Sequence, residues 1–355
     1  MSLDFSREPL RVRWHRHGLN TGTVFGLTRC GVTHIPRWAS YAIGHVGTRL
    51  AFHMCTQATS GLIDNLRVVR PDLGDRELRQ LALRAYRSYA TETIDFIRSL
   101  SLDRRRIASW LSPESTFDRV QRGADGLLLI TGHIGNIELG AVLLRLLYDY
   151  PLAVVLLPEN DARVNEMRLN MRASVGIDSI EVRRELDTAL RIRRLLSENW
   201  AVAMIADRPL GRDRLEVEFF GRPTGFLRSP ALMAYLTGVP MVPSFILRQP
   251  DGRYAGFALE PIYVSRSDDR EVAVRTAMQT FATALENVVR QHPHLWYHFY
   301  PYWGDDERSQ VEGQKEEDAA RNSPGADIAP ANRRAVAEAE LRSAATTRRC
   351  ARLGE

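Results

Sequence analysis

The sequence predicts an α/β protein with a central, mostly parallel or mixed sheet, covered by helices on both faces, and a helical N-terminal segment that associates with a membrane. From residue 126 onward, short apolar runs alternate with longer segments in which apolar residues recur at helical spacing. Strands that alternate with helices are typical of a parallel sheet buried on both faces. The length of 355 residues and the hydrophobic content of 44% allow a sizeable core.

Each apolar run predicts one strand, and each periodic segment between two runs predicts one helix. The strands are expected at 127–131, 152–157, 179–182, 201–206, 215–220, 241–247 and 254–259. The helices are expected at 137–148, 163–174, 186–199, 229–237 and 271–290. The uncharged stretch 229–247 is interrupted by Pro230, Gly238 and Pro240, which favours a helix, a turn and a strand over a membrane span.

The chain before residue 123 is predicted to be helical and basic. Apolar residues recur at helical spacing over 75–110. The uncharged runs 38–48 and 50–63, separated by Arg49, are each too short to span a bilayer, and amphipathic helices lying on a membrane surface fit them. An ordinary helical subdomain packed on the core remains the alternative. The expected interface anchors are Trp14, Trp38, Tyr41 and Phe52.

The basic residues exclude some functions and indicate a partner. Lys315 is the only lysine, so mechanisms that need a buried lysine, such as P-loop phosphate binding, are excluded. Residues 1–122 hold 19 Arg against 11 acidic residues, a net charge of +8, and 9–63 hold six Arg and no acid. Such a segment suits an anionic membrane surface or a nucleic acid. No nucleic-acid-binding module is recognised, so the membrane surface is the predicted partner.

Three regions are predicted along the chain. They are a basic helical region at 1–122, an α/β core at 123–304 that forms one domain with the preceding helices, and a disordered tail at 305–355. The three cysteines are far apart and match neither a zinc site nor a disulfide framework, so no metal is expected and a reducing compartment fits. The N-terminus lacks the apolar stretch of a signal peptide.

The segment Thr131-Gly-His-Ile-Gly-Asn-Ile-Glu138 carries the strongest chemical signal. It follows a predicted buried strand and precedes a helix, a place where open α/β sheets hold their sites. If His133 lies in the loop, Glu138 can reach one imidazole nitrogen and leave the other free to take a proton from an alcohol. The alternative is a capped helix start, with Asn136 as the cap and Glu138 at the positive end of the helix dipole.

Gly-His-Ile-Gly-Asn-Ile-Glu-Leu139 resembles the H-x4-D/E block of glycerolipid acyltransferases, and more narrowly that of the lipid A lauroyl/myristoyl and phosphatidylinositol mannoside acyltransferases. Further blocks are similar in order and spacing from about residue 20 to 303. They are Arg172 to Gly176, Ala206-Asp207-Arg208, Val217 to Gly221, and Ser229 to Pro243.

The resemblance implies an acyltransferase enzyme that transfers an acyl chain from an acyl carrier protein or coenzyme A thioester to a hydroxyl of a lipid or glycolipid. His133 is expected to act as the general base, oriented by Glu138, and no cofactor or metal is required. Arg172 and Arg208 are expected to bind phosphate groups, and Asp207 to orient His133 or the acceptor. The candidate substrate-binding residues are Gly135, Asn136, Arg172, Asp207, Arg208, Phe220 and Gly221.

Departures from the family pattern leave the acceptor open among a lipid A precursor, a phosphatidylinositol mannoside, a lysophospholipid and a specialised glycolipid. Ile137 stands where the lipid A enzymes usually carry Trp, no N-terminal transmembrane helix is evident, and 296–303 only loosely resembles the closing block. We expect a peripheral enzyme on the cytoplasmic face of the inner or plasma membrane. The competing hypothesis is a non-catalytic lipid-binding protein with the same fold.

Overall fold

The computed structural model describes residues 31–32, 34–116, 126–159, 161–182, 185–266 and 269–303. The expectations for Trp14 and for the tail at 305–355 therefore lie outside the described residues. The described residues up to Tyr302 belong to one compact unit, the first of two into which the contacts divide the chain, and of the second unit only Trp303 is described.

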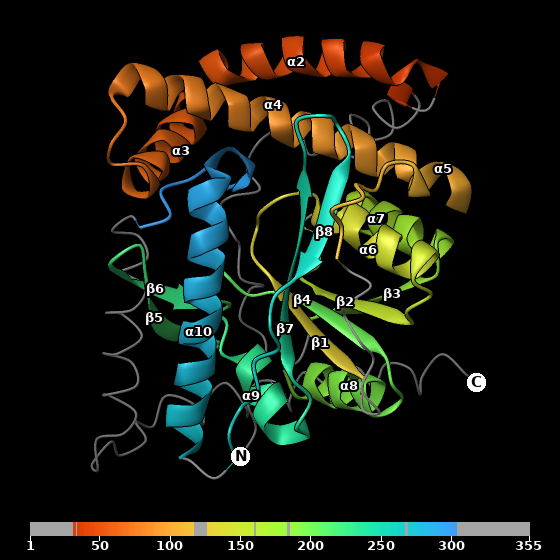
Figure 1. Ribbon diagram of the computed structural model, residues 1–355, viewed down its shortest axis with the longest axis vertical. Helices are drawn as coiled ribbons and strands as arrows, with labels where there is room; N and C mark the ends of the chain where they lie inside the picture. The colour runs from red at the N-terminus through yellow and green to blue at the C-terminus, as the bar shows by residue number, and fades with distance from the viewer. Residues whose placement is uncertain are drawn as a thin grey trace, which may run out of the picture. The chain divides into compact units, whose positions relative to one another are not determined.

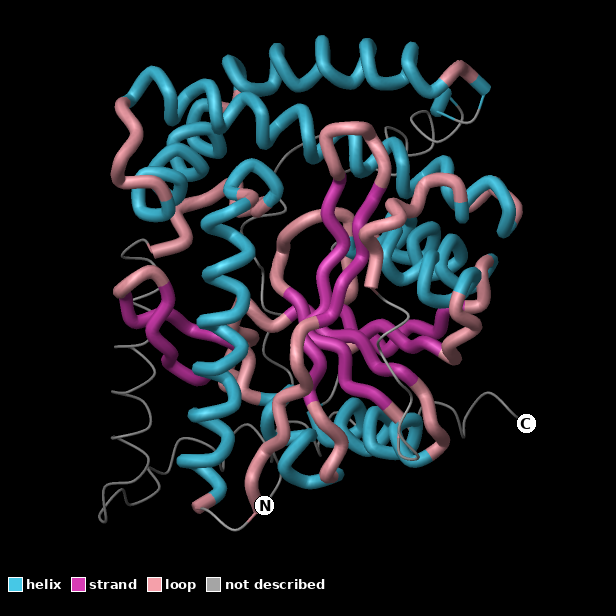
Figure 2. Tube along the Cα trace, in the orientation of Figure 1, coloured by secondary structure: helices cyan, strands magenta, loops and turns pink. Residues whose placement is uncertain are grey.

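A six-stranded sheet forms the centre of the first unit, with the strand order β3-β2-β4-β1-β7-β8. Figure 2 draws its strands in magenta. All neighbouring strands are parallel except β8, which pairs with β7 as an antiparallel hairpin. Every residue of β1 is buried, as expected for a strand with neighbours on both sides and helices above and below. The strands are β1 (Leu127–Thr131), β2 (Leu152–Leu156), β3 (Ile177–Glu181), β4 (Ala201–Ile205), β7 (Met241–Arg248) and β8 (Tyr254–Ala258).

Helices flank the sheet on both sides, as predicted (Figure 1). On one side, α6 (Ile137–Leu147) contacts β2, β3 and β7, and α7 (Ala162–Ser174) packs along β3. On the other side, α8 (Glu185–Ser197) contacts β3 and β4, and α9 (Ser229–Thr237) contacts β1 and β7. The long helix α10 (Arg270–Gln291) packs beside α9. The predicted alternation of strands and helices is therefore confirmed.

Two details of the core differ from the prediction. Strand β5 (Leu215–Phe219) continues into β6 (Arg222–Phe226), and the pair forms a separate antiparallel hairpin. Phe220 and Gly221 have φ of 54° and 69°, the left-handed conformation that a two-residue type I′ turn needs. Strand β6 was not predicted because Arg-Pro-Thr-Gly-Phe contains two residues that usually mark turns.

The N-terminal region contains four helices among the described elements, and the first of them crosses Arg49, which separates the two uncharged runs of the sequence. Helix α2 runs unbroken through Arg49 and ends at Cys55, where the backbone leaves helical geometry. It lies along the outer side of α4 (Figure 1). Among the described residues, no helix is both long and apolar enough to cross a bilayer. The helices are α2 (Arg37–Met54), α3 (Thr56–Val69), α4 (Asp75–Ser99) and α5 (Arg104–Ala108).

The three described anchor candidates behave differently. Trp38 is 74% exposed, as an interface residue requires. Phe52 is buried, with its ring 5.6 Å from that of Tyr86. Tyr41 donates a hydrogen bond of 2.5 Å to Asp95, so its hydroxyl is directed into the protein. The predictions for Phe52 and Tyr41 are therefore wrong, because helix periodicity alone did not indicate which face of α2 meets α4.

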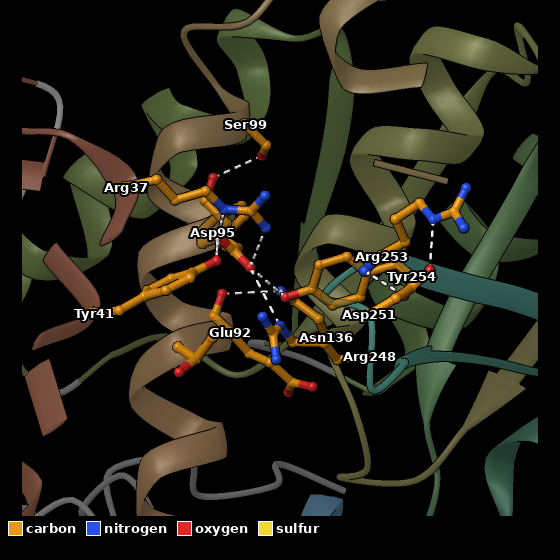
Figure 3. A network of polar contacts seen from close by, with 12 residues as sticks. Arg37, Tyr41, Glu92, Asp95, Ser99, Asn136, Arg248, Asp251, Arg253 and Tyr254 are labelled. Carbon is orange, nitrogen blue, oxygen red and sulfur yellow. Dashed lines mark hydrogen bonds and ion pairs between the residues drawn. The ribbon is translucent and has the colours of Figure 1, made fainter. Parts of the chain in front are cut away.

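A buried carboxylate connects the N-terminal helices to the sheet (Figure 3). Asp95 on α4 is fully buried and accepts two hydrogen bonds of 2.9 Å from Arg37 on α2. It also accepts a hydrogen bond of 2.7 Å from the hydroxyl of Tyr254 on β8. Since a buried carboxylate is stable only when it is paired and hydrogen-bonded, this contact fixes α2 and α4 against the core.

Candidate active site

The register of two central strands brings a histidine and an aspartate together. Strands β1 and β4 are parallel neighbours, and Thr131 lies beside Ile205 at their carboxyl ends. His133 and Asp207 each follow two residues after these positions. Because the strands end at the same level, the two side chains meet at the same edge of the sheet.

His133 and Asp207 are joined by two hydrogen bonds. The Nδ1 of His133 lies 2.6 Å from one Asp207 carboxylate oxygen, and the backbone N–H of His133 donates a hydrogen bond of 2.8 Å to the other. A carboxylate can only accept, so Nδ1 carries the proton and Nε2 has a free lone pair. The His133 side chain is 24% exposed, whereas that of Asp207 is fully buried. A partly exposed imidazole with one nitrogen fixed by a buried carboxylate has the geometry of a general base.

A second histidine shares the same carboxylate, and the sequence did not reveal it. His298 is fully buried, its Nε2 lies 3.1 Å from Asp207, and its Nδ1 lies 3.2 Å from the hydroxyl of Tyr300. The rings of His298 and His133 are 5.5 Å apart. His298 lies in the aromatic segment that only loosely resembled the closing block of the family, so its place beside Asp207 had no clear sequence signal.

The electrostatic environment keeps Asp207 ionised and both histidines neutral. Burial favours a higher pKa for Asp207, but the electrostatic interaction with His133 and the hydrogen bonds from His133 and His298 outweigh it and hold that pKa well below its usual range. Burial, with the positive charge of Arg208, lowers the pKa of His133. The same two causes lower the pKa of His298 to about 3. His133 therefore lies ready as a neutral base near pH 7.

Glu138 has a different partner from the one predicted. Both of its carboxylate oxygens accept hydrogen bonds from the guanidinium of Arg172, with 3.0 Å between Nε and Oε2 and a shorter contact at the second pair. Burial favours a higher pKa for Glu138, but Arg172 outweighs it and lowers that pKa. The pair links α6 to α7. The carboxylate that holds the imidazole is thus that of Asp207, and Arg172, expected to bind phosphate, is occupied by Glu138.

The loop between β1 and α6 depends on Gly135 and Asn136. Gly135 has φ of 66°, and a Cβ there would lie 2.1 Å from the carbonyl oxygen of Ile246, so no other residue fits. Asn136 caps α6 by accepting a hydrogen bond from the N–H of Leu139, and its side-chain amide donates a hydrogen bond of 2.8 Å to the carbonyl oxygen of Glu92. The capped-helix interpretation therefore describes Asn136, and both residues shape the site from within the protein.

The segment that carries His298 is held from two sides. The N–H of Tyr297 donates a hydrogen bond of 2.9 Å to the carbonyl oxygen of His133. On the other side, the amide of Asn65 on α3 donates to the carbonyl oxygens of His298 and Tyr300, at 2.9 and 2.7 Å. Helix α3 therefore contributes to the geometry around Asp207.

The remaining predicted residues surround this cluster. Arg208 is half-buried and donates a hydrogen bond of 3.0 Å to the carbonyl oxygen of Tyr297. It lies near enough to His133 to lower the pKa of that imidazole. Phe220 is buried, and its ring faces that of Trp296 at 6.5 Å. Gly221 lies in the β5–β6 turn, with open space where a side chain would be. The hairpin thus approaches the site through Trp296, which packs 4.3 Å from His298.

His133, Asp207 and His298 also form a cluster of the residue types that bind transition metals. Their donor atoms lie within 4.8 Å of one another. One nitrogen of each histidine already makes an N–H to carboxylate hydrogen bond with Asp207, at 2.6 and 3.1 Å, and these two bonds account for the arrangement. We therefore interpret the cluster as a proton-handling site.

Comparisons with known proteins agree with the family predicted from the sequence blocks. Residues 20–304 match the family model described as bacterial lipid A biosynthesis acyltransferase. Phosphatidylinositol mannoside acyltransferases from two Mycobacterium tuberculosis strains, CDC 1551 / Oshkosh and ATCC 25618 / H37Rv, are 32% identical over 108 residues. This stretch covers 30% of the chain and 32% of each relative. The matched part thus spans about a third of those curated relatives.

Proposed function

The chain belongs to the bacterial lipid A biosynthesis acyltransferase family, and we propose that it transfers a fatty acyl chain from a thioester to a hydroxyl of a lipid or glycolipid. The observation that carries this proposal is the hydrogen bond of 2.6 Å between His133 Nδ1 and the buried Asp207. It leaves Nε2 as a neutral proton acceptor on a partly exposed side chain.

The reaction proceeds in two proton transfers on one imidazole. Nε2 of His133 takes the proton of the acceptor hydroxyl, and the oxygen forms a bond to the thioester carbonyl carbon. The tetrahedral intermediate then expels the thiol sulfur, which receives that proton from His133. Asp207 stays ionised and stabilises the imidazolium between the two steps. Positioned general bases of this kind contribute roughly 10²- to 10⁴-fold to a rate.

The family and the charges near His133 support the proposed substrates. The donor is an acyl carrier protein or coenzyme A thioester, and the acceptor is of the lipid A precursor or phosphatidylinositol mannoside type. The positive charge of Arg208 beside His133 supports an acceptor that carries phosphate. Phe220, which shares the β5–β6 turn with Gly221, lies 6.5 Å from Trp296, and Trp296 lies 4.3 Å from His298, so we expect the acyl chain to pack along this aromatic edge of the site.

A peripheral location on the cytoplasmic face of the membrane completes the proposal. Ile43, Val46, Leu50 and Met54, which we name the α2 stripe, are between 59% and 78% exposed. Their spacing of three, four and four residues places them within about 80° of the helix circumference. A helix with one exposed apolar face is typical of proteins that lie in a membrane interface.

The test is acyl transfer by the purified full chain. Long-chain acyl thioesters and detergent-dispersed lipid acceptors of both types are supplied, and lipid products are measured by mass spectrometry. We expect transfer by the wild type and none by His133→Ala, with unchanged circular dichroism. Lipid binding without transfer in the wild type would favour the non-catalytic alternative, and full transfer by His133→Ala would exclude the assigned base.

A further inference from the structure

A groove on the N-terminal helices, separate from the His133 cluster, gathers positive charge. It has a volume of about 520 Å³ and lies between α2 and α4. Arg49 and His53 line it from α2, and Arg76 and Arg79 line it from α4. The ring of Phe52 forms part of its wall, with the Arg79 guanidinium 5.7 Å above the ring centre.

The arginines of this groove are not neutralised by the protein. Among the described residues, Arg49, Arg76 and Arg79 form no ion pair and no side-chain hydrogen bond. Asp75 is the one carboxylate along the lining, and it is bonded at 3.0 Å to Arg67 on α3, outside the groove. Three unpaired guanidinium groups around one hollow produce a positive potential that an external anion can satisfy.

The groove borders the α2 stripe. Arg49 and His53 directly precede Leu50 and Met54, so they lie about 100° around the helix from these two residues, on one flank of the stripe. Helix α2 contains no acidic residue at any of its positions. An apolar face flanked by unpaired arginines matches the layering of a leaflet, in which the phosphates lie just above the acyl chains.

We infer that this groove binds the phosphate of an anionic phospholipid headgroup while the α2 stripe inserts among the neighbouring acyl chains. The inference rests on the membrane-surface location proposed above and adds a specific lipid site to it. A soluble phosphate has the same chemistry, but the adjoining exposed apolar face favours a lipid as the occupant. The site orients the enzyme on the leaflet and takes no part in the chemical step.

Vesicle sedimentation of the full chain tests the inference. The probes are phosphatidylcholine vesicles and vesicles with added phosphatidylglycerol, at physiological salt. Arg76→Gln/Arg79→Gln is compared with Arg163→Gln/Arg193→Gln, an exposed pair on α7 and α8 that changes the net charge equally. We expect the groove variant to lose roughly 30-fold in binding to anionic vesicles, about fivefold per arginine, and the control pair to bind like the wild type.

Two further measurements separate the possible outcomes. Leu50→Ser/Met54→Ser should weaken binding to both kinds of vesicle, whereas the groove variant should weaken only the anionic preference. Acyl transfer to a detergent-dispersed acceptor should be unchanged in the groove variant. Loss of vesicle binding at the groove can therefore be told apart from loss of acyl transfer. The inference would be overturned if the control pair lost as much binding to anionic vesicles as the groove variant. It would also be overturned if the wild type bound inorganic phosphate at submillimolar concentration, and the groove variant lost this binding but still preferred anionic vesicles.

Discussion

Two carboxylates near the start of α6 have opposite surroundings. Asp207 is fully buried and is held by two imidazoles that can change protonation. Glu138 is 29% exposed on its side chain and is held by Arg172, a permanent cation. A carboxylate against a titratable ring can support proton transfer, whereas one against a guanidinium can only fix geometry. The difference shows that the two ends of H-x4-E have separate surroundings in this chain: His133 is the proposed base, whereas Glu138 joins α6 to α7 through Arg172.

The largest expected effect comes from Asp207→Asn. The amide can present an N–H toward Nδ1, which favours the tautomer with the proton on Nε2 and removes the base. We expect kcat to fall by about 10²- to 10⁴-fold, while vesicle binding is unchanged. The measurement is steady-state acyl transfer with the wild type as reference. A loss below tenfold would mean that Asp207 does not hold the catalytic tautomer.

Glu138→Gln should affect stability more than chemistry. It leaves Arg172, a residue only 6% exposed, without its charged partner. Breaking one side of a largely buried pair costs about 3 kcal/mol, at the lower end because Glu138 is partly exposed. Chemical denaturation measures this loss, and kcat of the folded variant should stay within about tenfold of the wild type. If Glu138→Gln lowered kcat as much as Asp207→Asn, the two carboxylates would not differ in role.

His298 should make the protein less stable in acid. Its pKa is about 3 in the folded protein and about 6.5 in an unfolded chain. Between these values the unfolded state binds one more proton, so stability is complete above pH 6.5 and falls as the pH drops toward 3. His298→Gln, which keeps a donor for Asp207, should flatten the slope by about 1.4 kcal/mol per pH unit. Urea unfolding at several pH values gives both slopes, and parallel slopes would contradict the expectation.

The smallest expected effect is a displaced pH profile. Burial and the charge of Arg208 lower the pKa of His133, so the acid limb of kcat/KM should lie below pH 6.5, with activity present above it. Arg208→Gln removes one of these causes and should move the limb to higher pH. Arg163→Gln serves as a control of equal charge change on α7 and should leave the limb in place. An acid limb that does not move would separate Arg208 from the titration of His133.

The sequence by itself determined most of the elements and singled out His133 as the candidate base. Apolar runs indicated β1, β4 and β7 because a buried parallel strand is apolar along its whole length. The local pattern from Gly132 to Glu138, after a predicted strand and before a predicted helix, made His133 the candidate base. Both signals are local, since they depend on residues close together in the chain.

Only the tertiary structure decided which groups meet. The contact between His133 and Asp207 joins residues 74 positions apart and depends on the register of β1 against β4. The contact of Asp207 with His298 spans 91 positions and depends on α3 holding the closing segment. Whether Phe52 faced the membrane or the core depended likewise on how α2 packs against its neighbours. Such pairings arise from packing between distant segments, which local periodicity does not encode.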